Sequence, residues 1–158
     1  MTKVSWPKRP ELFRSSFEIL NGDGILADDY FPLLRGAGLI EEHDRNFRIV
    51  YERLAKSIEA YPKAHNTYNS AAWMASRACR ELPDAMKKIE RALAMRPRQA
   101  AYLDTMAEVW FAKQDRSKAV EWSRKAVRDS FHGGSGSEAG VGLREQYDRF
   151  ISGEFPVP

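Results

Sequence analysis

The feature that most constrains this chain is a repeated spacing of small residues between positions 61 and 130. Alanines recur 34 or 35 residues apart, and large apolar residues stand on either side of them. The pairs are Ala72 with Ala107, Ala85 with Ala119, and Ala92 with Ala126. Self-similarity at this period indicates stacked repeats, in which each unit covers the apolar face of the next.

The hydrophobic pattern between these points is helical. In residues 39–61, Phe47, Val50, Leu54 and Ile58 fall at helical spacing. No stretch shows a convincing period-two alternation. The pattern therefore predicts an all-α chain, with Asp115 as the N-cap of one helix. We expect helices over residues 39–61, 64–80, 83–95, 98–113, 115–130 and 143–151, and a short one over 26–35.

The alternation of small and large residues has a packing explanation. Two helices approach closely only where one side chain is small and large neighbours fill the flanks. The six alanines are the expected points of close approach. The residues expected to fill the space between them are Met106, Trp110, Ile89, Leu93 and Val127.

The spacing and residue types resemble the tetratricopeptide repeat family, whose pattern is W-x2-L-G-x2-Y, then A-x3-F and P. One copy reads Leu103-x2-Met106-Ala107-x2-Trp110, then Ala119. The preceding copy reads Tyr68-x2-Ala71-Ala72-x2-Ala75, then Ala85-x3-Ile89, Ala92 and Pro97. Residues 39–61 resemble the second helix of an earlier, degraded repeat. The resemblance implies antiparallel helix pairs stacked as a short α-solenoid, with a C-terminal capping helix.

This interpretation divides the chain into four parts. Residues 1–38 form an N-terminal arm with short helices, and residues 39–131 form the helical repeats. A Gly/Ser-rich linker over 132–142 leads to a capping helix and tail over 143–158. Leu143, Tyr147 and Phe150 are expected to lie on the preceding helix.

Composition and charge limit the class of protein. Of the 158 residues, 43% are apolar and 30% are charged, which is typical of a soluble globular chain. No apolar window of about 18 residues predicts a membrane span. The N-terminus lacks a secretory h-region and Cys79 is the single cysteine, so we expect a cytoplasmic protein, although a signal removed before residue 1 would escape notice.

Chemistry-bearing residues do not assemble into a predicted active site. His43, His65 and His132 show no ligand spacing and are expected at the surface or as caps, and Cys79 as a half-buried thiol. The segment NGDG lacks ligands at the first and twelfth positions of a calcium loop. We therefore expect a non-enzymatic protein with no catalytic residues, no metal and no cofactor.

The family resemblance also implies where a partner would bind. In tetratricopeptide proteins the first helix of each pair lines a concave face that binds peptides. Asn side chains there can bond a peptide backbone, and Trp73 and Phe111 can serve as anchors. The matching positions predicted to bind a protein or peptide partner are Asn66, Asn69, Trp73, Arg77, Asp104, Glu108 and Phe111.

Two alternatives remain open. In the first, Trp73 and Phe111 pack against the N-terminal helices or the C-terminal tail, and the chain is a structural or self-association module. In the second, less favoured, the basic helices bind nucleic acid. Residues 61–130 hold 14 Lys and Arg against 8 Asp and Glu, although the whole chain carries only +3.

Overall fold

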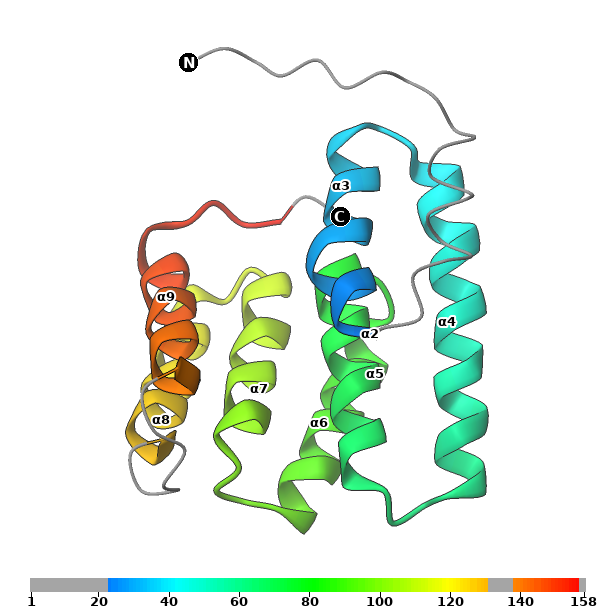
Figure 1. Ribbon diagram of the computed structural model, residues 1–158. Coiled ribbons are helices and arrows are strands. Elements are labelled where there is room, and N and C mark those ends of the chain that lie inside the picture. Colours follow the sequence, from blue (N-terminus) through cyan, green and yellow to red (C-terminus); the bar gives the residue numbers. More distant parts are fainter. Residues whose placement is uncertain (1–22, 131–137, 157–158) are drawn as a thin grey trace.

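The computed structural model describes residues 23–130 and 138–156, and these form helices and turns with no strand among them. Consecutive long helices alternate in direction (Figure 1). The short N-terminal elements are α2 (Asp23–Ile25), the π-helical turn η1 (Leu26–Tyr30) and α3 (Phe31–Gly36). The longer helices are α4 (Ile40–Ala60), α5 (His65–Ala78), α6 (Leu82–Met95), α7 (Ala100–Ala112), α8 (Arg116–Ser130) and α9 (Glu138–Ser152).

The all-α prediction is confirmed for the described residues, and the helix bounds from α4 to α8 lie close to the expected ones. Helix α4 ends at Ala60, before Pro62, and buries Phe47, Val50 and Leu54. Asp115 caps α8 as predicted, because its Oδ1 accepts a hydrogen bond from the Lys118 amide at 3.0 Å.

Helices α5 and α6, and likewise α7 and α8, pack as antiparallel neighbours joined by short turns. All six alanines of the repeated spacing are fully buried, as the close-approach interpretation requires. Ile89 is fully buried and Met106 nearly so, whereas Trp110, Leu93 and Val127 are half-buried. Small side chains and large neighbours thus share the interior of the stack.

The N-terminal elements belong to the core. Asp23 to Gly36 form a continuous helical run, and the π-helical turn precedes Pro32, which cannot donate an intrahelical hydrogen bond. Phe31 is fully buried and contacts the rings of His43 and Phe47 edge-on. The expectation that His43 lies at the surface is therefore wrong: it is 0% exposed, because α3 packs over this turn of α4.

Helix α9 begins at Glu138, five residues before the predicted start, so the expected linker over 132–142 overlaps its first turns. His132 and residues 1–22 lie outside the described part of the chain. Helix α9 packs on α8 and more lightly on α7. Phe150 is fully buried, and Tyr147 and Leu143 are half-buried.

Candidate functional site

A groove of about 590 Å³ lies between α5, α7 and α9. The turn before α7 and the end of α8 complete its wall. We call it the central groove, and it is lined among others by Asn69, Trp73, Ala101, Asp104, Thr105 and Gln146.

The central groove brings together three of the seven predicted site residues. Asn69 and Trp73 reach it from α5, and Asp104 reaches it from α7. Asn66 is exposed on α5 and does not line the groove. Arg77, Glu108 and Phe111 lie outside its lining.

Asp104 is the most unusual residue of the groove. Its side chain is 7% exposed, and Oδ1 has no hydrogen-bond partner among the described residues. Burial, reinforced by the nearby Glu108 carboxylate, raises the pKa of Asp104 to about 7, against the opposing effect of Arg149 and Arg77. Near neutral pH this carboxyl group is therefore close to half ionised.

Asn69 adds a second unsatisfied acceptor, since its Oδ1 is also buried without a partner in the described structure. Thr105 uses its hydroxyl proton within α7, where Oγ1 donates to the Ala101 carbonyl oxygen at 3.0 Å. Its oxygen lone pairs are left as acceptors. The polar atoms in this part of the groove are thus acceptors that a hydrogen-bond donor of a ligand would satisfy.

Trp73 is half-buried and held from the N-terminal side. Its Nε1 donates to Asp28 Oδ1 of η1 at 2.8 Å. The Arg77 guanidinium lies 5.7 Å from the ring centroid. The indole therefore has a fixed position at the wall of the groove.

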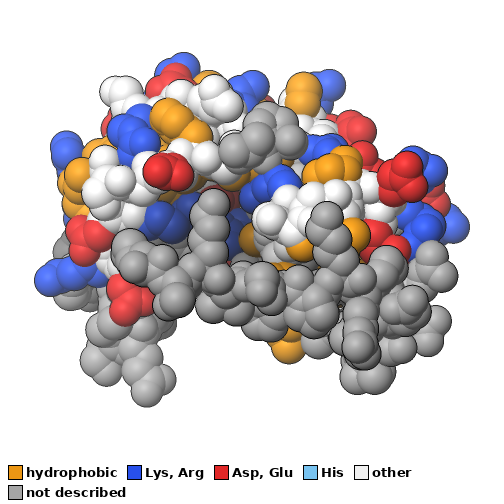
Figure 2. Space-filling view, turned by 90° about the horizontal axis from the view of Figure 1, so that it is seen from above, with side chains coloured by type: hydrophobic (Ala, Val, Ile, Leu, Met, Phe, Trp, Pro, Cys, Tyr) orange, Lys and Arg blue, Asp and Glu red, His pale blue; other side chains and the backbone are white. Residues whose placement is uncertain are grey.

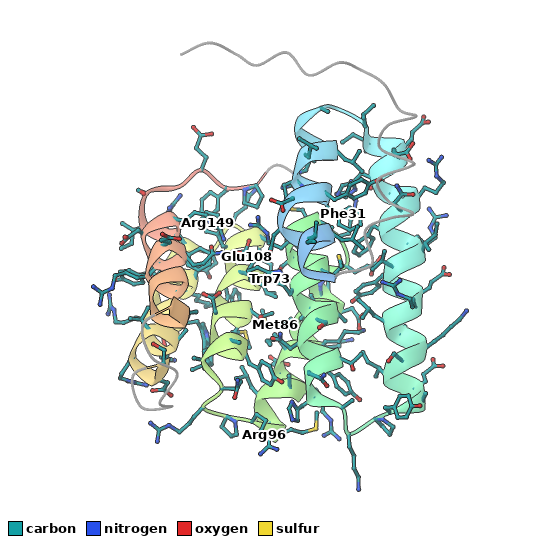
Figure 3. The ribbon with its side chains drawn as sticks, viewed as in Figure 1. Phe31, Trp73, Met86, Arg96, Glu108 and Arg149 are labelled. Carbon is teal, nitrogen blue, oxygen red and sulfur yellow. The ribbon has the colours of Figure 1, made fainter. Side chains whose placement is uncertain are left out.

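Glu108 is not an open contact for a partner, because it is 1% exposed. Its Oε1 accepts a hydrogen bond from Arg77 Nη1 at 3.2 Å, and its Oε2 accepts one from Arg149 Nη2. In Figure 3, Arg149 on α9 and Glu108 on α7 point toward one another, with Trp73 of α5 nearby. Two arginines thus neutralise this buried carboxylate. The prediction from sequence includes Arg77 but misses Arg149, which lies 41 residues from Glu108.

Phe111 is fully buried and so does not present an exposed anchor. Its ring centroid lies 5.1 Å from that of Phe150 on α9 and 5.0 Å from that of Phe155 in the tail. Arg116 and Arg149 place their guanidinium groups over the same ring. The C-terminal segment therefore covers the position at which an outside partner was expected.

Arg116 holds the C-terminal segment in place by hydrogen bonds to its main-chain atoms. Its guanidinium donates to the carbonyl oxygens of Phe150 at 2.5 Å, Ile151 at 2.9 Å and Gly153 at 2.6 Å. These carbonyls stand at the end of α9, where a helix lacks internal donors. We call this arrangement the Arg116 clamp.

Other reactive groups are buried or dispersed. Cys79 is 6% exposed, its Sγ accepts a hydrogen bond from Arg35, and burial raises its pKa. No group of three or more His, Cys, Asp or Glu side chains that could hold a metal ion occurs within residues 23–130 and 138–156.

Comparisons with known proteins add no relative. No family model matches the chain, and neither the curated proteins nor the solved structures give a match. None of the helices in the described part of the chain is both long enough and apolar enough to cross a membrane.

Proposed function

We propose that this chain is a non-catalytic interaction module, built from tetratricopeptide-like helix pairs, that binds a segment of a partner polypeptide in the central groove. The observation that carries the proposal is the groove itself, about 590 Å³ in volume, with buried unsatisfied acceptors from both α5 and α7 in its wall. Buried polar atoms without partners are uncommon in folded proteins. A bound segment would supply the missing donors from its backbone or side chains.

The proposed site includes the predicted binding residues that line the groove and leaves out those that the chain itself covers. Asn69, Trp73 and Asp104 line the groove, whereas Glu108 and Phe111 are covered by the chain itself. The bound segment is therefore expected to lie along the N-terminal half of α7.

Filling the groove tests the proposal. Ala101 is exposed on α7 and lines the groove, so Ala101→Trp should obstruct it without disturbing the core. Peptides selected from a random display library on the full chain would be measured by calorimetry. We expect the obstructed variant to lose at least about tenfold in affinity, or about 1.4 kcal/mol.

The matched control is Ala94→Trp, at an exposed alanine of α6 outside the groove. This variant should bind the selected peptides as the wild type does. Failure to select any peptide, or equal binding by both variants and the wild type, would reject the groove as the site.

A structural role is the second candidate, and the buried Phe111 favours it. Phe150, Phe155 and the Arg116 clamp close the last helix pair from within the chain. If no peptide binds the groove, this closed end supports a module that serves to cap or space other domains.

Nucleic-acid binding receives less support. Figure 2 shows acidic and basic side chains interspersed over the described part of one face, with no single-sign patch there. A nucleic-acid site on this chain would require binding that weakens steeply as salt increases.

A further inference from the structure

The charges around Asp104 leave one carboxyl group without a cation. Arg77 lies 3.7 Å from Asp28 and 3.2 Å from Glu108, and Arg149 binds the other oxygen of Glu108. These two arginines and two acids balance each other. Asp104 forms no ion pair among the described residues. When ionised, it therefore adds one uncompensated negative charge to the groove.

The rest of the groove lining does not supply the missing charge. Arg98 also lines the groove, but its side chain is 72% exposed and lies 3.5 Å from Asp129. Asn69 Oδ1 and the Thr105 hydroxyl oxygen add acceptors rather than donors. A ligand group suited to this wall would carry one positive charge and several donors.

We propose that Asp104 is the recognition point for a lysine ammonium group carried by the partner segment in the central groove. An ammonium has three donors and no acceptor, which matches the acceptors of Asp104, Asn69 and Thr105. Trp73 provides an aromatic wall for the apolar stem of the lysine. This inference rests on the proposed function and specifies the chemistry that the same groove recognises.

The geometry also links binding to pH. The ammonium binds the ionised form of Asp104, whose pKa is about 7. The charged groups that face it are Asp28 from η1, Arg77 from α5, Glu108 from α7 and Arg149 from α9. Because only about 1% of Asp104 is ionised two pH units below its pKa, affinity should fall about 100-fold from pH 8 to pH 5.

A small probe tests the inference on the full chain. The probe is Nα-acetyl-lysine methylamide, followed by backbone amide shifts in a two-dimensional NMR titration at pH 8. Its control is the same compound acetylated on the side-chain nitrogen, which removes the charge. We expect saturable shifts at Ala101, Asp104 and Thr105 with the lysine probe, none with the acetylated compound, and loss of the response at pH 5.

Asp104→Asn is the matched variant, because it keeps the size of the side chain and removes its charge. The shifts should vanish in this variant while its amide spectrum shows a folded chain. The assignment would be overturned by equal shifts with the acetylated compound or by an unchanged response in the variant. Tighter binding of the corresponding arginine compound, Nα-acetyl-arginine methylamide, would also overturn it.

The two proposals fail separately. If selected peptides bind the wild type and not Ala101→Trp, yet Asp104→Asn retains full affinity, the groove is a binding site and the lysine assignment is wrong. If no peptide is selected, but the lysine probe binds at Asp104, partner binding fails while the ammonium site stands.

Discussion

Helices α5 and α7 occupy equivalent positions in the repeated sequence, yet their inner faces have different environments. Trp73 on α5 and Glu108 on α7 lie 35 residues apart, as do Asn69 and Asp104. Trp73 and Asn69 are half-buried, whereas both acids are almost completely buried. The residues on the two faces therefore align in sequence but differ in how deeply they are buried.

The two helices differ in what lies against them, because α9 and the C-terminal tail pack beside α7. Helix α9 and Phe155 cover the C-terminal half of α7, around Phe111. Only the N-terminal half of α7, around Asp104, still borders the groove.

Truncation of Phe111 should give the largest effect. Phe111→Ala removes a fully buried ring that contacts two other phenylalanine rings, so we expect a loss of about 3–5 kcal/mol in the free energy of unfolding. Urea unfolding followed by circular dichroism measures this loss. A loss under about 1 kcal/mol would mean that the cap does not seal α7 in solution.

The charge of Asp104 should give the next largest effect. Since its pKa is raised to about 7, the folded chain holds a proton that the unfolded chain releases above about pH 4. The contribution of Asp104 to stability is thus favourable at low pH and is lost as pH rises from about 4 to 7. Relative to the wild type, Asp104→Asn should gain up to about 4 kcal/mol across this window.

This prediction is checked by urea unfolding of both proteins at several pH values. Asn69 holds the equivalent position on α5 and does not titrate, so Asn69→Ser serves as the control. A stability difference between the wild type and Asp104→Asn that stays constant from pH 4 to 8 would contradict the raised pKa.

Overpacking should affect both helices alike. Ala72→Leu and Ala107→Leu each force a larger side chain into a fully buried position, at a cost of about 1–3 kcal/mol. Thermal unfolding of the two variants measures the cost. If one variant melts as the wild type does, the 35-residue register does not describe the packing at that helix.

Truncation of Trp73 should give the smallest loss. Trp73→Ala removes a half-buried ring and one hydrogen bond to Asp28, so we expect a loss of about 2 kcal/mol or less in the free energy of unfolding. The same urea experiment as for Phe111 allows direct comparison. Losses of equal size in the two variants would show that the inner faces are equally closed.

Much of the fold could be predicted because its signals are local. Pro62 and the Asp115 cap delimit helices through backbone geometry and short-range hydrogen bonds. The repeated alanine spacing predicts close contacts between helices that lie in the same segment of the chain as the alanines. Each of these signals is complete within a few residues or one repeat.

Prediction from sequence fails where distant segments meet. The local sequence around His43 gives no sign of α3, so it wrongly predicts an accessible side chain. For Phe111 the sequence leaves open whether an outside partner or the C-terminal tail covers the ring, and the structure shows Phe155 of the tail against it. Helix α9 begins at Glu138 despite Gly140 and Gly142, since packing on α8 offsets the weak helix propensity of glycine. Arg149 escapes prediction because its partner Glu108 lies on another helix.

The Arg116 clamp has a consequence for how this chain tolerates substitution. Its three acceptors are main-chain carbonyl oxygens, which every amino acid carries. Side chains at the exposed positions 151, 152 and 154 are therefore free to change without loosening it. Gly153 is the exception, because a Cβ there would collide with the Arg149 carbonyl oxygen. In any set of related chains, we expect variable residues around an unchanging Arg116 and Gly153.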